Sequence, residues 1–158
     1  ATLKAVNKGV DGEQAVEAGR RVTASGMKLS MMIILGLAGA EGSERHALAT
    51  AKAINIIKPT HLSALCLMLY RGSELLDQYE AGKFNPLSPA GLMRELKLII
   101  ENIDLPADRH CLFRSNHVSN YVQLAATLPH DKQRLLRDID YSIAQLSKLK
   151  SWDVYNYN

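Results

Sequence analysis

Lys28-Leu-Ser-Met-Met-Ile-Ile-Leu-Gly-Leu-Ala-Gly-Ala-Glu-Gly-Ser-Glu-Arg-His46 joins a short apolar run to a glycine-rich segment. Between residues 29 and 35 the run is apolar except for Ser30, and it is too short to cross a bilayer. A short apolar run that ends at a glycine is typical of a β-strand covered on both faces. The segment therefore predicts a buried strand, a turn and the start of a helix.

Glycines follow this strand at positions 36, 39 and 42. Glycine allows positive φ and lets a ligand approach the bare backbone. Ser43 is suited to cap the helix that follows. Because ligands of α/β sheets bind beyond the carboxyl ends of the strands, the range 36–43 is predicted to form one wall of any site. An ordinary turn between a strand and a helix fits the same residues equally well.

Length and composition narrow the class of protein. The 158 residues are expected to form one domain over 1–150 and a short tail at 151–158. The net charge of +3 is a small excess of 19 basic over 16 acidic residues with the signs interleaved, so no nucleic-acid-binding surface is indicated. No signal peptide or transmembrane segment is visible, and no membrane partner is expected. Cys66 and Cys111 lie in apolar runs and are expected to be reduced, buried thiols in a cytoplasmic protein.

The rest of the chain alternates predicted strands and helices. Apolar runs predict further strands at 61–70 and 109–114, each preceded by a helix, which implies parallel pairing. Helices are predicted at 11–25, 43–57, 73–79, 88–103, 121–126 and from 131 onward. Three parallel strands are too few to close a barrel, which takes about eight. The chain is therefore an α/β protein that ends in a long helix, and it is either a small open sheet or a slice of a larger barrel. Because Ala1 starts as if in mid-element, we expect a fragment of a longer protein.

Several motifs occur in a fairly specific order and spacing over most of the chain. They are Val6-Asn7-Lys8-Gly9, Ile34-Leu35-Gly36-Leu37-Ala38-Gly39, Ser43-x-x-His46, Tyr70-Arg71-Gly72-Ser73-x-Leu75, and Phe113-Arg-Ser-Asn-His-Val-Ser-Asn120 followed by Leu128-Pro129. Together they resemble the later half of the radical S-adenosylmethionine enzymes. The closest similarity is to the group of iron–sulfur oxidoreductases whose substrate is unknown.

The resemblance implies parallel βα repeats that form the C-terminal half of a TIM-like barrel. In this family, three cysteines at C-x-x-x-C-x-x-C spacing hold a [4Fe–4S] cluster, which binds S-adenosylmethionine and cleaves it to an adenosyl radical. This chain has no such motif, and it would begin after the region that carries it. S-adenosylmethionine and the cluster are therefore expected in the full-length parent, which would be an oxidoreductase. No cofactor and no turnover are expected of this fragment alone.

The resemblance also implies which residues line the adenosyl pocket. Ile34 would pack on the adenine ring, and backbone groups of Gly36, Leu37 and Ala38 would meet the edge of the ring. If Ile34 points inward, the side chains at 28, 30 and 32 do too, because side chains alternate along a strand. The common family pattern has a glycine where this chain has Met32, so the match is partial.

Polar side chains that follow the third predicted strand are candidates for binding a substrate. Arg114, His117 and Asn120 would lie at the ligand end of the sheet, where they could bind an anionic or polar group. A loop held by hydrogen bonds between side chains and backbone explains them equally well. His46, near a helix N-terminus, is expected to be neutral and to hydrogen-bond the glycine turn or a ligand, with a structural role favoured.

Other functions remain open at this point. A stand-alone α/β module could use the same glycine turn for a nucleotide, and a structural interaction domain would have no small-molecule site. A cut barrel would leave a strand edge uncovered, so we expect either self-association through that edge or helices folded over it. The substrate cannot be inferred from the sequence.

Overall fold

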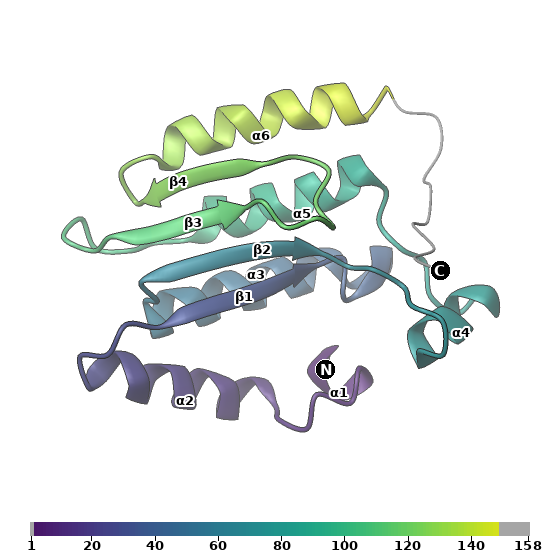
Figure 1. The fold of residues 1–158 in the computed structure, drawn as a ribbon, viewed down its shortest axis with the longest axis horizontal. Coiled ribbons are helices and arrows are strands. Elements are labelled where there is room, and N and C mark those ends of the chain that lie inside the picture. The colour runs from purple at the N-terminus through teal and green to yellow at the C-terminus, as the bar shows by residue number, and fades with distance from the viewer. Residues whose placement is uncertain (1, 149–158) are drawn as a thin grey trace.

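A four-stranded sheet forms the centre of the molecule (Figure 1). The structure is a computed structural model that describes residues 2–148. The strands are β1 (Ser30–Leu35), β2 (His61–Cys66), β3 (Cys111–Ser115) and β4 (Leu124–Leu128), and they lie in the order β1-β2-β3-β4. The helices are α1 (Thr2–Ala5), α2 (Gly12–Ala24), α3 (Gly39–Ile57), α4 (Glu74–Glu80), α5 (Pro89–Asn102) and α6 (Lys132–Leu146).

The first three strands are parallel, as the sequence predicts. Helix α3 connects β1 to β2, and α4 and α5 lie between β2 and β3. The described part of the chain ends in helix α6, as expected. The α/β class and the mostly parallel sheet are therefore confirmed. The predicted tail at 151–158 lies outside the described residues.

Strand β4 corrects one prediction. The range 121–126 was expected to be helical, but residues 124–128 form a strand antiparallel to β3, with Phe113 opposite Ala126. Burial alternates along this strand, with Leu124, Ala126 and Leu128 buried and Ala125 exposed. Two alanines give the segment little β propensity of its own, so pairing with β3 and burial of alternate residues decide its conformation.

The helix ends agree in part with the helix starts predicted at residues 11, 43 and 88. The Asp11 side chain accepts the backbone N–H of Gln14 at 2.8 Å in a capping box, and the Ser88 hydroxyl caps α5. Ser43 was expected to cap α3, but this helix begins at Gly39 with Ala38 as its N-cap residue. The glycines of the turn continue directly into the helix. Ser43 therefore lies inside α3, and its hydroxyl donates to Glu95 instead of capping the helix.

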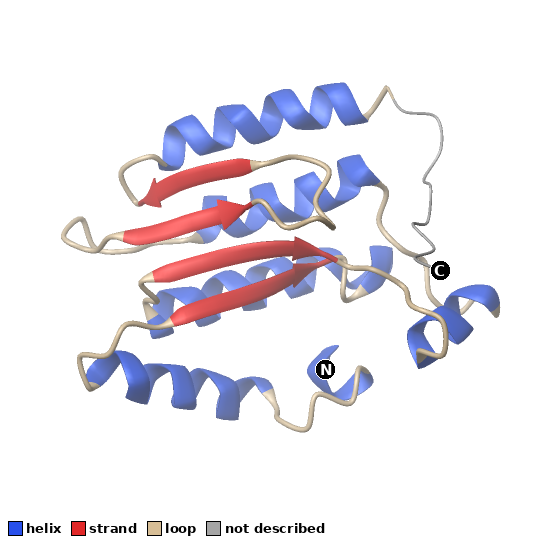
Figure 2. Cartoon of the chain, in the orientation of Figure 1, coloured by secondary structure: helices blue, strands red, loops and turns tan. Residues whose placement is uncertain are grey.

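Helices cover only one face of the sheet. Figure 2 shows α3 and α5 behind the strands and no helix in front of them, while α6 lies beyond β4 and α2 lies beyond β1. Alternate strand residues are buried on the covered side: Ile33, Leu35, Leu62, Ala64, Cys66, Cys111, Phe113, Leu124, Ala126 and Leu128. The expectation that β1 is covered on both faces is therefore wrong, because Met32 is 71% exposed and Ile34 is 40% exposed. The apolar run of β1 has a helix layer on one side only.

The two outer edges of the sheet differ. Thr127 of β4 donates its N–H to Asp131 and accepts the N–H of the same residue, both at 2.8 Å. Arg134 donates to the backbone oxygen of Ala125 at 3.1 Å. The start of α6 therefore occupies the outer edge of β4. Strand β1 pairs with β2 on one side, and no other described strand lies on its outer side.

No helix of the described chain is both long enough and apolar enough to span a bilayer.

Candidate functional site at the carboxyl end of the sheet

The uncovered face of the sheet, called the open face below, carries a mixed set of side chains. On β1 the exposed residues are Ser30, Met32 and Ile34, which confirms that they share one face. The alternation of buried and exposed residues puts Ser63 and Leu65 of β2 and Leu112 and Arg114 of β3 on the same face. Lys28 precedes β1 and is exposed. The open face thus combines apolar and polar side chains with the guanidinium group of Arg114.

Gly36 ends β1 in a conformation that requires glycine. Its φ is +82°, and a Cβ added there would lie 2.8 Å from Cδ2 of Leu92 on α5. Its N–H donates to Oε1 of Glu95 at 2.9 Å, and its carbonyl accepts the N–H of Gly39 at 3.0 Å. The N–H expected to meet a ligand is therefore bound within the chain, and Gly36 shapes the turn.

The remainder of the turn rests on the segment before α5. Gly39 has φ +65°, and a Cβ there would lie 3.1 Å from the backbone oxygen of Asn85. The same oxygen accepts the N–H of Ala40 at 2.8 Å. Between these anchored points lie Leu37 and Ala38, both half-buried, and no described residue accepts a hydrogen bond from their N–H groups. Of the backbone N–H groups at 36–38, the one at Gly36 is therefore used by the chain, while those of Leu37 and Ala38 are not bound by any described residue.

A buried carboxylate holds the turn in place. Glu95 of α5 is 2% exposed, and it accepts the N–H of Gly36 and the hydroxyl of Ser43. Nδ1 of His46 lies 3.1 Å from Oε1 of the same carboxylate. This cluster ties the β1–α3 turn and the first turns of α3 to α5. It agrees with the structural interpretation of His46.

Sequence reasoning missed Glu95. The sequence predicted a helix over 88–103 but no role for this residue, and its burial emerges only from the structure. The available signal was its position between Met93 and Leu96, which are both fully buried. An acidic residue among core residues requires partners, because a buried unpaired charge is strongly unfavourable. The partners lie 49 to 59 residues away in sequence, so the pattern of α5 could not identify them.

Asn120 joins the diverging ends of β2 and β3. Backbone pairing between these strands covers only residues 61–63 and 112–114. Beyond it, the Asn120 side chain accepts the N–H of Cys66 and donates to the carbonyl of Ala64, both at 2.8 Å, and donates to the Ser115 hydroxyl at 2.9 Å. The amide thus takes the place of a strand peptide. This favours the second interpretation of Asn120, a loop held by hydrogen bonds, over direct substrate binding.

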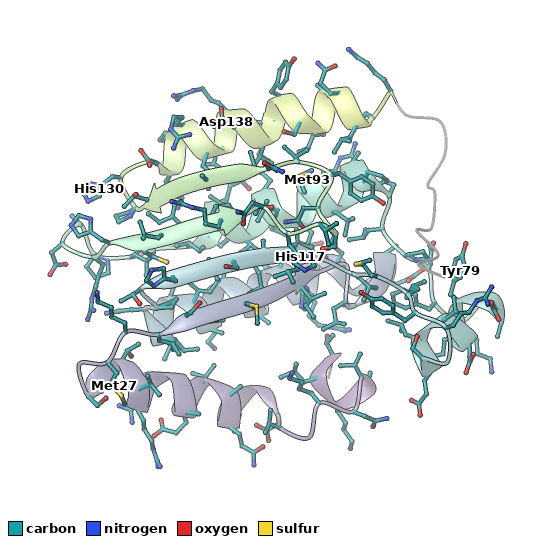
Figure 3. All side chains as sticks on the ribbon, in the orientation of Figure 1. Met27, Tyr79, Met93, His117, His130 and Asp138 are labelled. Atoms are coloured by element: carbon teal, nitrogen blue, oxygen red, sulfur yellow. The ribbon has the colours of Figure 1, made fainter. Side chains whose placement is uncertain are left out.

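Arg114 and His117 remain accessible at this end of the sheet. Arg114 is exposed on the open face and donates to the neighbouring carbonyl of Phe113 at 2.9 Å. His117 is exposed, and its Nδ1 lies 2.8 Å from the Ser119 hydroxyl and accepts the N–H of Ser119. Figure 3 shows His117 where β2 and β3 end. Of the three candidate substrate-binding residues, these two could contact an anionic or polar ligand.

The two thiols lie at opposite ends of neighbouring strands. Cys66 ends β2, whereas Cys111 begins β3. Both are free and buried, as expected, and burial raises the pKa of each thiol to about 11. At this separation they cannot ligate one iron–sulfur cluster, which needs three thiolates in the family considered above. Among residues 2–148, no group of three or more His, Cys, Asp and Glu side chains is arranged to hold a metal ion.

The fold and this site define an α/β protein with an open sheet face and a braced glycine turn at the carboxyl end of its edge strand. A scan of protein-family models gave no match to the chain, and a search of curated proteins gave none at a significant level.

Proposed function

We propose that this chain is part of the catalytic barrel of a radical S-adenosylmethionine enzyme, an iron–sulfur oxidoreductase, and that it supplies part of the adenosyl pocket and of the substrate chamber. The observation that carries the proposal is the open face beside the glycine turn. Three parallel strands leave one face bare, and Ile34 lies on that face immediately before the turn. In this proposal β1, β2 and β3 are consecutive strands of a TIM-like barrel whose remaining strands belong to other polypeptide.

The residues of this chain would bind and orient the adenosyl group. Ile34, which is 40% exposed, offers an aliphatic surface for the adenine ring. The N–H groups of Leu37 and Ala38 can donate to the ring edge, while the Glu95 cluster keeps the turn rigid. A [4Fe–4S] cluster held by cysteines elsewhere in the parent would supply the electron that cleaves S-adenosylmethionine.

The substrate side of the chamber would lie over β2 and β3. Arg114 presents a permanent positive charge on the open face, and His117 lies where these strands end. Both groups suit a substrate with a carboxylate, phosphate or other polar group. Asn120 would act by keeping the two strand ends at a fixed spacing.

The rival nucleotide-binding module is less well supported. Glycine turns that bind nucleotide phosphates use free backbone N–H groups near a helix N-terminus. Here the N–H of Gly36 is bound to the buried carboxylate of Glu95, which would repel a phosphate at that position. A neutral adenine ring avoids this repulsion. A structural interaction module without catalysis is distinguished by the experiment below.

The test uses the full-length parent protein reconstituted anaerobically with iron and sulfide. Replacing Ile34 by Glu should weaken binding of S-adenosylhomocysteine about tenfold or more, because the adenine loses its apolar contact and meets a charge. Isothermal titration calorimetry measures this affinity. Gly36→Val would not test the pocket alone. Gly36 has a left-handed φ and a side chain there would meet Leu92, so this substitution would distort the fold.

Leu48→Glu is the matched control. Leu48 is 42% exposed on α3, nearly the same as Ile34, and it is outside the open face. Equal affinities for the two variants and the wild type would remove Ile34 from the pocket. A parent protein without a C-x-x-x-C-x-x-C motif, or one that takes up no iron and sulfide, would overturn the proposed function.

A further inference from the structure

A pair of histidines lies at the opposite end of the sheet from the candidate site. His110 immediately precedes β3, and His130 follows β4. Antiparallel pairing of Cys111 with Leu128 brings these two ends together. The two imidazole rings have their centroids 5.2 Å apart and their planes tilted by 33°. Both side chains are exposed among the described residues.

The spacing suits a shared metal ion. Zinc bonds imidazole nitrogen at about 2.0–2.1 Å in tetrahedral sites, which sets the centres of two such rings roughly 5 Å apart. Imidazole is also a preferred ligand of divalent copper and nickel. We propose that His110 and His130 form a two-histidine site for Zn²⁺ or a similar divalent transition metal, with water completing the coordination.

The surrounding charges are compatible with a cation. The carboxylate of Asp131, next to His130, accepts the N–H of Thr127 and lies 3.2 Å from Arg134. Lys132, the nearest ammonium along the chain, donates to the carbonyls of Ile103 and Glu101. Its charge is therefore fixed at the end of α5.

Arg109 precedes His110 in the chain and is exposed, and its positive charge lowers the expected affinity for a cation. With two protein ligands and water, the site is expected to be weaker than a structural site with four protein ligands. A dissociation constant on the order of micromolar is expected.

A bound ion would link two segments that are distant in sequence. It would join the loop before β3 to the turn between β4 and α6. The ion would thus hold β3 and β4 together at the end where Cys111 pairs with Leu128. Figure 3 shows His130 at the far end of the sheet from His117. The proposed metal site therefore does not depend on the proposed function, and the zinc titration and the S-adenosylhomocysteine titration test separate claims.

The test is calorimetric titration of the full chain with zinc chloride in a buffer that does not chelate metals. One Zn²⁺ per chain is expected, and His110→Gln and His130→Gln should each weaken binding about tenfold or more. His117→Gln is the matched control, since it removes an exposed histidine at the other end of the sheet and should leave the affinity unchanged. Because all three side chains are exposed, the variants should keep the wild-type melting temperature in the absence of metal.

A second measurement identifies the ligands directly. The imidazole ¹⁵N resonances of His110 and His130 should shift on addition of Zn²⁺, and those of His117 should not. Wild-type binding no stronger than that of the double variant His110→Gln with His130→Gln would overturn the proposal. So would single variants that bind zinc as well as the wild type.

Discussion

The two faces of the sheet are built from the same strands but differ in what covers them. On the covered face, Leu35, Leu62 and Phe113 are fully buried against the helices. On the open face, Met32 is 71% exposed and Leu112 is 37% exposed. Apolar area removed from water contributes about 25 cal/mol per Å², so the covered face accounts for most of the stability and the open face for little. Substitutions should therefore cost much stability on the covered face and little on the open face.

The largest test of this contrast compares two adjacent residues of β3. Phe113→Ala should destabilise the chain by about 3–5 kcal/mol, because it removes a ring from the core and leaves a cavity. Leu112→Ala, on the open face, should change stability by less than about 1 kcal/mol. Urea unfolding followed by circular dichroism measures both. Comparable losses for the two variants would mean that the open face is covered in solution.

Glu95 sharpens the comparison because it is an acidic side chain buried on the covered side of the sheet. Glu95→Ala should destabilise the chain by about 2–4 kcal/mol, because it leaves the Gly36 N–H and the Ser43 hydroxyl buried without their acceptor.

Glu101→Ala serves as the control for this variant. Glu101 is exposed on the same helix and lies 3.8 Å from the ammonium of Lys97, so its removal should change stability by less than about 0.5 kcal/mol. Urea unfolding of both variants gives the difference. A Glu95→Ala chain as stable as the wild type would show that the turn needs no brace.

Met32 gives the smallest expected change in stability and tests what the open side of β1 does. The wild-type chain is expected to self-associate through this strand, and Met32→Lys should reduce the association because a charge on an edge strand opposes pairing. Its own stability should change by less than about 0.5 kcal/mol, since Met32 is 71% exposed. Sedimentation velocity over a range of concentrations measures the association. A wild-type chain that remains monomeric throughout would contradict the expectation.

Local sequence signals predicted the parts of the fold whose determinants are close together in the chain. The apolar run ended by Gly36 marked β1 and its turn, and the helix predicted to start at residue 88 corresponds to α5. The burial of β1 was overestimated, because a continuous apolar run does not show whether a second layer is present. Strand β4 was missed because its alanines favour no strand until β3 lies beside them.

The sequence predicted where in the fold the candidate residues lie, but not which of them make hydrogen bonds within the chain. Its place at the carboxyl end followed from the order of strands and glycines. The use of Gly36 and Asn120 by the chain itself could not be predicted, because their partners lie 59 and 54 residues away. Such contacts are set by how strands and helices meet in space, and no local pattern encodes them. For Asn120 the sequence supported two roles equally, and the hydrogen bonds favour the structural one.

The hydrogen bonds that Asp131 and Arg134 make to β4 limit how copies of this chain could assemble. Because the outer edge of β4 is occupied, β1 is the described strand whose outer edge could pair with a strand of another copy. If two copies pair through their β1 edges, neither copy has a further free edge, so assembly stops at a dimer. A sheet with both outer edges free could instead add copies indefinitely, as in fibres.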